Sequence, residues 1–190
     1  AAHMADGYSR VSDSNIGAAI STSGPGATNL ITAIACSWFD SVPVIYITGQ
    51  VTRFRMKKDL GVRQIGFQET DIVPMVKNIT KYAKQILRPN EILYELEKSY
   101  QIAINGRQGP VLIDIPDDIQ RMNIKRSDLK DSYFEINNKK NQNSKILKKK
   151  IDKILINLEL AKRPILITGS GINSSKSKEL VIKIRNKLNI

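Results

Sequence analysis

The sequence has few of the residues that build disulfides and metal centres. Its 190 residues include a single cysteine and a single histidine. Cys36 has no second cysteine with which to form an internal disulfide, and it lies on the apolar side of an expected helix, which predicts a buried, unreactive thiol. His3 has no partner at metal-ligand spacing, so we expect a packed or exposed helix residue there rather than a ligand.

Long apolar runs are also missing. No stretch approaches the length of a membrane span, and the first residues have neither the basic region nor the small-residue cleavage site of a signal peptide. We therefore expect no membrane partner and a cytoplasmic location. With 41% hydrophobic and 25% charged residues, the composition is typical of a globular protein.

The net charge of +12 is unevenly distributed. Residues 1–120 hold twelve basic and twelve acidic residues, so residues 121–190, with eighteen basic and six acidic residues, supply the whole excess. That basic part contains only Tyr133 and Phe134 as aromatic residues that could stack on bases. We interpret it as a solvated linker and helix face, and expect no nucleic-acid partner.

Short apolar runs without polar alternation are typical of parallel strands that are covered on both faces. Amphipathic helix patterns separate them, which predicts a doubly wound α/β domain with a mostly parallel sheet. One helix, after residue 27, is expected to bury Leu30, Ile31, Ile34, Ala35 and Trp38. Another is expected to bury Ile92, Leu93, Leu96, Tyr100, Ala103 and Ile104. The expected strands are Ile16–Ser21, Val44–Thr48, Val111–Ile115 and Ile165–Thr168.

Composition divides the chain into three parts. Residues 1–120 form the first domain, residues 121–143 are polar enough to be an interdomain linker, and residues 144–190 begin a second α/β domain. In that last part a basic amphipathic helix is expected from Lys145 to Leu160, before the helix-breaking Pro164. Both ends of the chain lie in helical patterns, so we expect a fragment of a longer protein.

The segment Thr22–Asn29, with the sequence TSGPGATN, lies where the first expected strand meets a helix. Its two glycines allow backbone angles closed to other residues, and Pro25 stiffens the corner between them. At the carboxyl end of a parallel strand this is where open α/β sheets bind ligands. A tight turn with only a structural role is the alternative.

Six further blocks favour the ligand-binding interpretation. Together with the glycine turn they follow one another in the order found in the pyrimidine-binding domain of thiamine-diphosphate enzymes. The chain most closely resembles the catalytic subunit of acetolactate (acetohydroxyacid) synthase, strongly over residues 1–120 and more loosely over residues 155–190. The blocks are Ala5–Arg10, Thr22–Asn29, Asp40–Pro43, Ile47–Val51, Gly66–Glu69, Gly106–Val111 and Asp114–Pro116.

The resemblance implies an enzyme that decarboxylates pyruvate and joins the two-carbon unit to a second 2-oxo acid in branched-chain amino acid biosynthesis. It implies thiamine diphosphate with Mg²⁺, whose ligands would lie outside this chain. It also implies a homo-oligomer, a dimer or tetramer, and a possible regulatory subunit. In the family a glutamate activates the cofactor from a position that would precede Ala1, so we expect no catalytic residue in this chain and no activity of the isolated fragment.

Other site residues follow from the same resemblance. Gln68 matches the glutamine that contacts thiamine diphosphate, and Phe67 matches the aromatic that borders the substrate. For both, a helix-entry turn with a buried phenylalanine is the alternative. Ser41 and Lys81 match positions around the channel to the active site, although Lys81 is nearly as well interpreted as an ordinary solvated lysine.

Two positions bear on a flavin. Arg107 matches the arginine that contacts FAD, with a simple loop arginine as the alternative. Gly169 opens a Gly-Ser-Gly segment that is expected to follow a strand and precede a helix, so its amides could face a phosphate-bearing cofactor. Related enzymes keep this domain without a flavin, so FAD is expected less firmly than thiamine diphosphate.

Two departures from the synthase pattern affect the acceptor. The segment Thr52–Gly66 is longer and more basic than its usual counterpart, and Asp117 stands where the family has a lysine near the substrate entrance. A carboxylate there would disfavour an anionic acceptor. The alternatives are therefore a related decarboxylase or carboligase with another acceptor, such as a keto-sugar, and, in a different class, a non-catalytic nucleotide-binding module.

Overall fold

The computed structural model describes residues 1–12, 16–136 and 144–188. The chain divides into two compact units, Ala1–Asn138 and Lys139–Ile190, and each is described by itself. The expected domain limits at residues 120 and 143 stay predictions.

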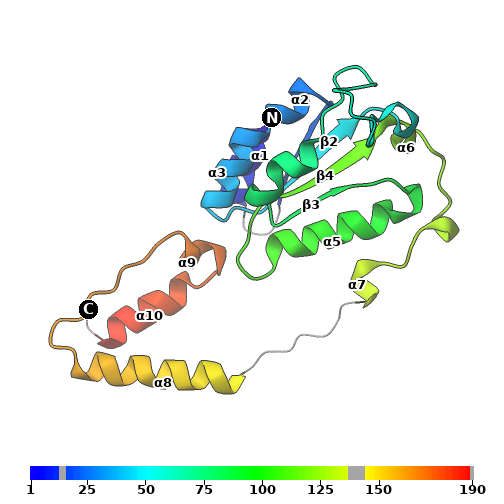
Figure 1. Cartoon of the computed structure of the whole chain (residues 1–190). Helices are drawn as coiled ribbons and strands as arrows, with labels where there is room; N and C mark the ends of the chain where they lie inside the picture. Colours follow the sequence, from blue (N-terminus) through cyan, green and yellow to red (C-terminus); the bar gives the residue numbers. More distant parts are fainter. Residues whose placement is uncertain (13–15, 137–143, 189–190) are drawn as a thin grey trace. The chain divides into compact units, whose positions relative to one another are not determined.

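The first unit contains a parallel sheet of the strand order β1-β2-β4-β3 (Figure 1). In the register, Ile20 pairs with Ile47, and Ile47 in turn pairs with Ile113. Three of the expected strands are present within a residue or two, and the parallel α/β fold is confirmed. The strands are β1 Gly17–Ser21, β2 Val44–Gln50, β3 Tyr82–Gln85 and β4 Val111–Pro116.

The strand β3 was not expected from the sequence. It lies at the sheet edge, paired only with β4, and Lys84 in its middle is exposed. An edge strand is open to solvent, so it need not be apolar, and a charged residue there also discourages pairing with other chains. The apolar-run criterion finds β2 and β4 inside the sheet and the apolar edge strand β1, and misses β3 with its Lys84.

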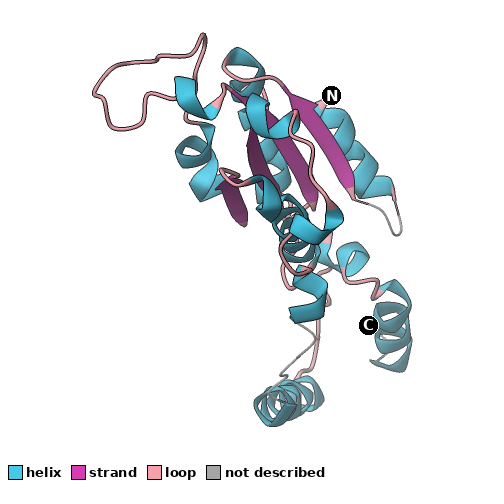
Figure 2. Cartoon of the chain, turned by 90° about the vertical axis from the view of Figure 1, so that its right-hand side faces the viewer, coloured by secondary structure: helices cyan, strands magenta, loops and turns pink. Residues whose placement is uncertain are grey.

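Helices lie on both sides of the sheet (Figure 2). Because side chains alternate along a strand, Tyr46 and Leu112 pack with Ile34 and Ile72 on one side, whereas Ile113 packs with Ile86 and Ile119 on the other. The helices of this unit are α1 Ala2–Val11, α2 Pro25–Thr28, α3 Ile31–Phe39, α4 Ile72–Val76, α5 Ile92–Ile104, α6 Asp117–Gln120 and α7 Tyr133–Ile136. Short 3-10 turns span Arg53–Arg55, Lys77–Ile79, Pro89–Glu91 and Arg126–Asp128.

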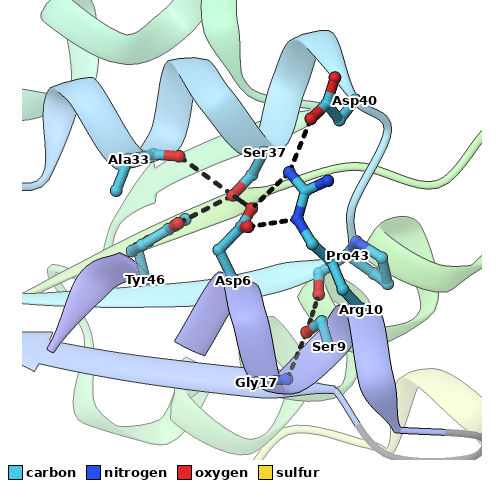
Figure 3. Close-up of polar contacts among 9 residues, drawn as sticks. All are labelled: Asp6, Ser9, Arg10, Gly17, Ala33, Ser37, Asp40, Pro43 and Tyr46. Atoms are coloured by element: carbon cyan, nitrogen blue, oxygen red, sulfur yellow. Dashed lines mark hydrogen bonds and ion pairs between the residues drawn. The ribbon is translucent and has the colours of Figure 1, made fainter. Parts of the chain in front are cut away.

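The buried face of α3 differs from the expected one. The helix buries Ala33, Ile34 and Ser37, and leaves Cys36 exposed, so the prediction of a buried thiol was wrong. The reason is a polar network that brings Ser37 into the core: its hydroxyl donates to Asp6 Oδ2 at 2.7 Å and lies 2.9 Å from the hydroxyl of Tyr46 (Figure 3). Because Ser37 has these partners in the core, the buried face of α3 includes Ser37 and differs from the face that the apolar residues predict.

The same network ties α1 to α3. The Arg10 guanidinium donates to Asp6 at 2.6 Å and to Asp40 at 2.7 Å, bridging the two helices (Figure 3). Burial raises the pKa of Asp6, but the hydrogen bonds from Arg10 and Ser37 outweigh it and lower the pKa overall. This cluster is thus a satisfied structural network.

The helix α5 shows a similar shift of its buried face. Ala103 is buried as expected, but Glu95 and Ser99 are buried in place of the larger apolar residues that the pattern favours, which are only half-buried. Glu95 accepts a hydrogen bond from the Tyr82 hydroxyl at 2.6 Å, and Ser99 donates to the Glu95 carbonyl at 2.6 Å. Buried polar residues with partners cost little, so they escape a hydrophobic-face analysis.

Part of the expected linker packs on α5. Glu97 accepts hydrogen bonds from the Ser132 hydroxyl at 2.6 Å and the Tyr133 amide at 2.8 Å, and the rings of Tyr94 and Tyr133 meet edge to face. Residues near 132–133 are therefore held against the first unit.

The second unit contains α8 Ser144–Leu160, α9 Gly171–Ser174 and α10 Lys178–Leu188. The expected basic helix is present as α8. The expected strand Ile165–Thr168 is not: these residues form no strand pairing, and Ile165 and Ile167 are 85% and 89% exposed. A strand needs a neighbour for its backbone hydrogen bonds, and the described residues of this unit offer none.

Candidate functional site at the carboxyl edge of the sheet

The parallel strands all end at one side of the sheet, which we call the carboxyl edge. There, the glycine turn follows β1, a long loop follows β2, and α6 follows β4 at the arrowheads in Figure 1. This edge is where open α/β sheets bind ligands. We call the opposite side, where the strands begin, the amino edge.

The glycine turn has a backbone that requires glycine. Gly24 has φ +61° and ψ −127°, angles that L-residues avoid, and it precedes Pro25 in the first turn of α2. A Cβ built on Gly24 would lie 2.7 Å from Gln68 Cβ and 2.8 Å from the Gln68 carbonyl oxygen. The turn is therefore packed directly against a residue 44 positions later.

We call residues 66–70 the Gln68 turn. Gln68 itself has a positive φ of 56°, and Phe67 beside it is 81% exposed, so the alternative of a buried phenylalanine was wrong. The two segments in which the sequence predicts ligand contact thus lie side by side at the carboxyl edge. The exposed aromatic ring of Phe67 suits a flat ring-bearing ligand.

The Gln68 turn closes a loop. The Gly66 amide donates to the Arg55 carbonyl at 2.9 Å, and the Glu69 carboxylate accepts the amides of Lys57 at 2.7 Å and Ile65 at 3.0 Å. One carboxylate therefore holds Lys57 and Ile65 together, two residues of the basic segment Thr52–Gly66 that the sequence singled out as unusual. The sequence reasoning missed this role for Glu69, because the two amides it binds carry no side-chain signal.

A cavity of about 490 Å³ lies beside this turn, lined among others by Gln50, Glu69, Thr70, Asp71 and Gln85. Two of its lining residues, Gln50 and Gln85, donate to the wholly buried Asp114, which accepts three side-chain hydrogen bonds in all, and burial raises the pKa of Asp114 despite them. A carboxylate inside an otherwise apolar strand was the available signal for this group, and the sequence reasoning did not use it.

Two acidic residues follow β4. Asp118 accepts the Arg53 amide at 3.0 Å and its guanidinium at 2.6 Å, which holds the loop after β2 to α6. Asp117, expected near the acceptor, is partly exposed and accepts Arg121 Nε at 2.9 Å. Because Arg121 compensates its charge, Asp117 repels an anionic acceptor less than the sequence suggests.

Three expected site residues lie at the amino edge instead. Ser41, Lys81 and Arg107 precede β2, β3 and β4 respectively. The Arg107 Nε donates to the Ser41 hydroxyl at 2.8 Å, and Ser41 has a positive φ of 59°. The structure therefore brings these two together, on the opposite side of the sheet from Gln68.

Lys81 binds backbone carbonyls at the carboxyl end of α5. Its Nζ donates to the carbonyls of Ile102 and, at 2.7 Å, Asn105, and burial lowers the pKa of the ammonium. Cations are favoured at a helix carboxyl end, where carbonyls lack intrahelical partners. This geometry favours a helix-capping role over one around a channel.

Gly169 lies in the second unit, without the preceding strand that the sequence predicts. The following helix α9 has only four residues. The strand-turn-helix geometry expected for a phosphate is thus lacking in the structure. Among the described residues no cluster of three or more His, Cys, Asp and Glu side chains could hold a metal ion. In that same part of the chain no helix is long and apolar enough to cross a membrane.

Comparison with known proteins gives consistent relatives. Residues 1–75 match the family described as thiamine pyrophosphate enzyme, N-terminal TPP binding domain. The chain is 37% identical over 190 residues to the acetolactate synthase large subunit of Haemophilus influenzae, covering 100% of this chain and 32% of that protein. It is 38% identical over 189 residues to the same subunit of Buchnera aphidicola subsp. Schizaphis graminum, covering 100% and 32%.

A relative of another activity is also similar. The glyoxylate carboligase of Escherichia coli O157:H7 is 33% identical over 181 residues, which covers 95% of this chain and 29% of that protein. The chain thus spans about a third of the length of the relatives it matches.

Proposed function

The chain belongs to the thiamine pyrophosphate enzymes and is homologous to acetolactate synthase large subunits over almost its whole length; on this basis we propose that the protein is a thiamine-diphosphate-dependent carboligase. It decarboxylates pyruvate and joins the two-carbon unit to a second 2-oxo acid, as in branched-chain amino acid biosynthesis. This chain supplies the part that holds the pyrimidine ring of the cofactor.

The observation that carries this proposal is the contact between Gly24 and Gln68. Two segments that resemble the cofactor-binding blocks of the family, far apart in sequence, meet at the carboxyl edge with no room for a Cβ between them. Gly24 itself is buried under Gln68, and the exposed ring of Phe67 beside this contact offers a surface that suits a planar heterocycle. The residues present therefore fit thiamine diphosphate.

The cofactor, when bound, supplies the thiazolium carbon that adds to the 2-oxo acid and takes up the electrons released on decarboxylation. Gln68 would hydrogen-bond it through a neutral amide, which orients the cofactor without adding charge. Phe67 borders the substrate and excludes water from it. We assign no acid or base to this chain, and expect the activating glutamate before Ala1.

Further properties follow from the family. We propose Mg²⁺ as the ion that accompanies the diphosphate, with its ligands outside this chain, and FAD as a second cofactor contacted by Arg107, whose side chain is exposed at the amino edge. We also propose a cytoplasmic homodimer or tetramer, with a regulatory subunit as a further partner. Ser41 stays a proposed channel residue, whereas Gly169, which lacks the preceding strand, is not proposed as an FAD contact.

A second candidate differs only in the acceptor. The carboxylate of Asp117, although paired with Arg121, favours a relative that joins its two-carbon unit to a different carbonyl compound, such as a keto-sugar, and the similarity to a glyoxylate carboligase shows that relatives of this chain differ in activity. The substitution Asp117→Lys separates the two. If Asp117 lies at the acceptor entrance, the change improves the use of an anionic 2-oxo acid and leaves donor decarboxylation almost unchanged. An equal effect on both steps would show a structural role.

The test of the proposed function is an assay of the full-length protein with pyruvate, thiamine diphosphate and Mg²⁺. We expect acetolactate to form only when thiamine diphosphate is present. Pyruvate that stays unconsumed by folded, cofactor-loaded protein would contradict it, and a product formed only with an added sugar or aldehyde would favour the second candidate.

A further inference from the structure

The buried carboxylate of Asp114 is hydrogen-bonded to Gln50 and Gln85, two residues that line the cavity beside the Gln68 turn. It is fully buried in β4, and Oδ1 accepts the Thr48 hydroxyl at 2.6 Å. Its Oδ2 accepts the side-chain amides of Gln85 at 2.8 Å and Gln50 at 3.2 Å. None of these partners is cationic. Burying a carboxylate without a cation costs free energy that hydrogen bonds must offset, so the donors Thr48, Gln85 and Gln50 are tied to this group.

Gln50 connects this carboxylate to the Gln68 turn. Its side-chain nitrogen donates to Asp114 and also to the Thr70 carbonyl at 2.7 Å, while its side-chain oxygen accepts the Val51 amide at 2.9 Å. Gln50 is only 5% exposed, so these bonds are shielded from water. The side-chain amide of Gln50 is therefore fixed at both ends.

Thr70 follows Gln68 by two residues. Its carbonyl also accepts the Ile72 amide at 3.0 Å, which ties the turn to the start of α4. On its other side the turn is packed against Gly24. Since Gln68 has a positive φ, the backbone there depends on such outside contacts to keep its conformation.

Resting on the proposed function, we infer that Gln50 and Asp114 form a brace that sets the position of the Gln68 turn, and so act as positioning residues for the cofactor contact. Neither side chain touches the cofactor. Asp114 orients the amide of Gln50, and Gln50 holds the Thr70 carbonyl, so that the Gln68 side chain is presented beside Gly24. Removing Gln50 frees the turn, whereas removing another partner of Asp114 does not.

The chain offers a matched control. Gln50→Met replaces the amide by an apolar group of similar length and removes the bond to Thr70. Thr48→Val removes one hydrogen bond from the same buried carboxylate, but on the branch that does not reach the turn. Gln50→Asn, which keeps an amide and withdraws it by one methylene, replaces Gln50→Met if that variant does not fold.

The first measurement is hydrogen exchange of the amides in residues 66–71 of the full-length protein without cofactor. Gln50→Met is expected to speed their exchange by about fivefold to tenfold relative to the wild type, the effect of one buried hydrogen bond, while Thr48→Val leaves these amides unchanged. Equal exchange in both variants, or no change in Gln50→Met, would overturn the brace.

The second measurement is the dissociation constant of thiamine diphosphate. Gln50→Met is expected to weaken it about fivefold to tenfold, and Thr48→Val to change it less than twofold, at similar losses of thermal stability. If amide exchange is faster in Gln50→Met but the wild type does not bind thiamine diphosphate, the brace is supported and the proposed function is refuted. Faster exchange without any weakening of cofactor binding would refute the positioning role.

Discussion

Replacement of Gly24 by alanine tests the contact on which the site depends. The new Cβ would lie 2.7 Å from Gln68 Cβ and 2.8 Å from its carbonyl oxygen, in a backbone conformation with φ +61°. The conformation costs about 1–3 kcal/mol for a residue other than glycine. Overpacking against the turn costs a further 1–3 kcal/mol or so. We therefore expect Gly24→Ala to lower the free energy of unfolding by about 2–6 kcal/mol.

Two other glycines separate these contributions. Gly61 also has a positive φ, of 68°, but a Cβ there would meet nothing within 4 Å. Gly61→Ala should therefore lower the free energy of unfolding by only about 1–2 kcal/mol, through the strain of its backbone conformation. Gly7 lies within α1 with equally open space, and Gly7→Ala should gain about 0.5–1 kcal/mol.

Urea denaturation followed by circular dichroism measures all three variants. The account requires Gly24→Ala to be clearly less stable than Gly61→Ala. If the two agree within about 0.5 kcal/mol, the turn after β1 does not pack on Gln68 and the site is assembled differently.

Other parts of the molecule give independent predictions. Asp118→Asn should cost about 0.5–1 kcal/mol at neutral pH. Slight burial raises the pKa of Asp118, but the hydrogen bonds and charge of Arg53 lower it overall. The stabilisation by Asp118 is therefore present above the unfolded pKa of about 3.9 and is lost as pH falls through the folded pKa. A difference in unfolding free energy between wild type and variant that is the same at pH 7 and pH 2 in urea titrations would contradict this. Lys81→Met should destabilise the protein by about 1 kcal/mol and leave thiamine diphosphate binding unchanged, which calorimetry checks; weaker binding would restore a channel role. Glu69→Gln loses the clamp on residues 57–65 and should speed tryptic cleavage there about tenfold, whereas an unchanged rate would show that the clamp is dispensable.

The sequence predicts three of the four strands and misses the fourth. The runs that became β2 and β4 are apolar because these strands lie inside the sheet, and that signal is local. The strand β1 lies at one edge and exposes Ile20, yet its run of small and apolar residues gives the same signal. The strand β3 lies at an edge and carries Lys84, so it gives no such signal. The run from Ile165 has the composition of a strand, yet it has no neighbour to pair with among the described residues.

The predictions of the buried helix faces are wrong for a different reason. Ser37 and Glu95 are buried because Tyr46 and Tyr82 provide hydrogen-bond partners from the sheet. Those partners come from distant parts of the chain, so no periodicity of the helix itself reveals them. The exposure of Cys36 follows from the same rotation of α3.

The candidate site could be predicted in its ingredients but not in its arrangement. Gly24 and Gln68 stand out as motifs, whereas their contact depends on the fold. Position relative to the strands was a usable signal for the rest: Ser41 and Arg107 precede strands and so lie at the amino edge, away from Gln68. Gln50 could not be recognised, because its role depends on a backbone carbonyl twenty residues away.

The central claim is that the carboxyl edge of this sheet holds thiamine diphosphate through Gln68. The most direct measurement is a calorimetric titration of the full-length protein with thiamine diphosphate in the presence of Mg²⁺, for the wild type and for Gln68→Ala. The account predicts saturable binding by the wild type and a dissociation constant about fivefold to a hundredfold weaker in the variant, the effect of one lost hydrogen bond of about 1–3 kcal/mol. Equal affinity in two folded proteins, or no binding by the wild type, would contradict it.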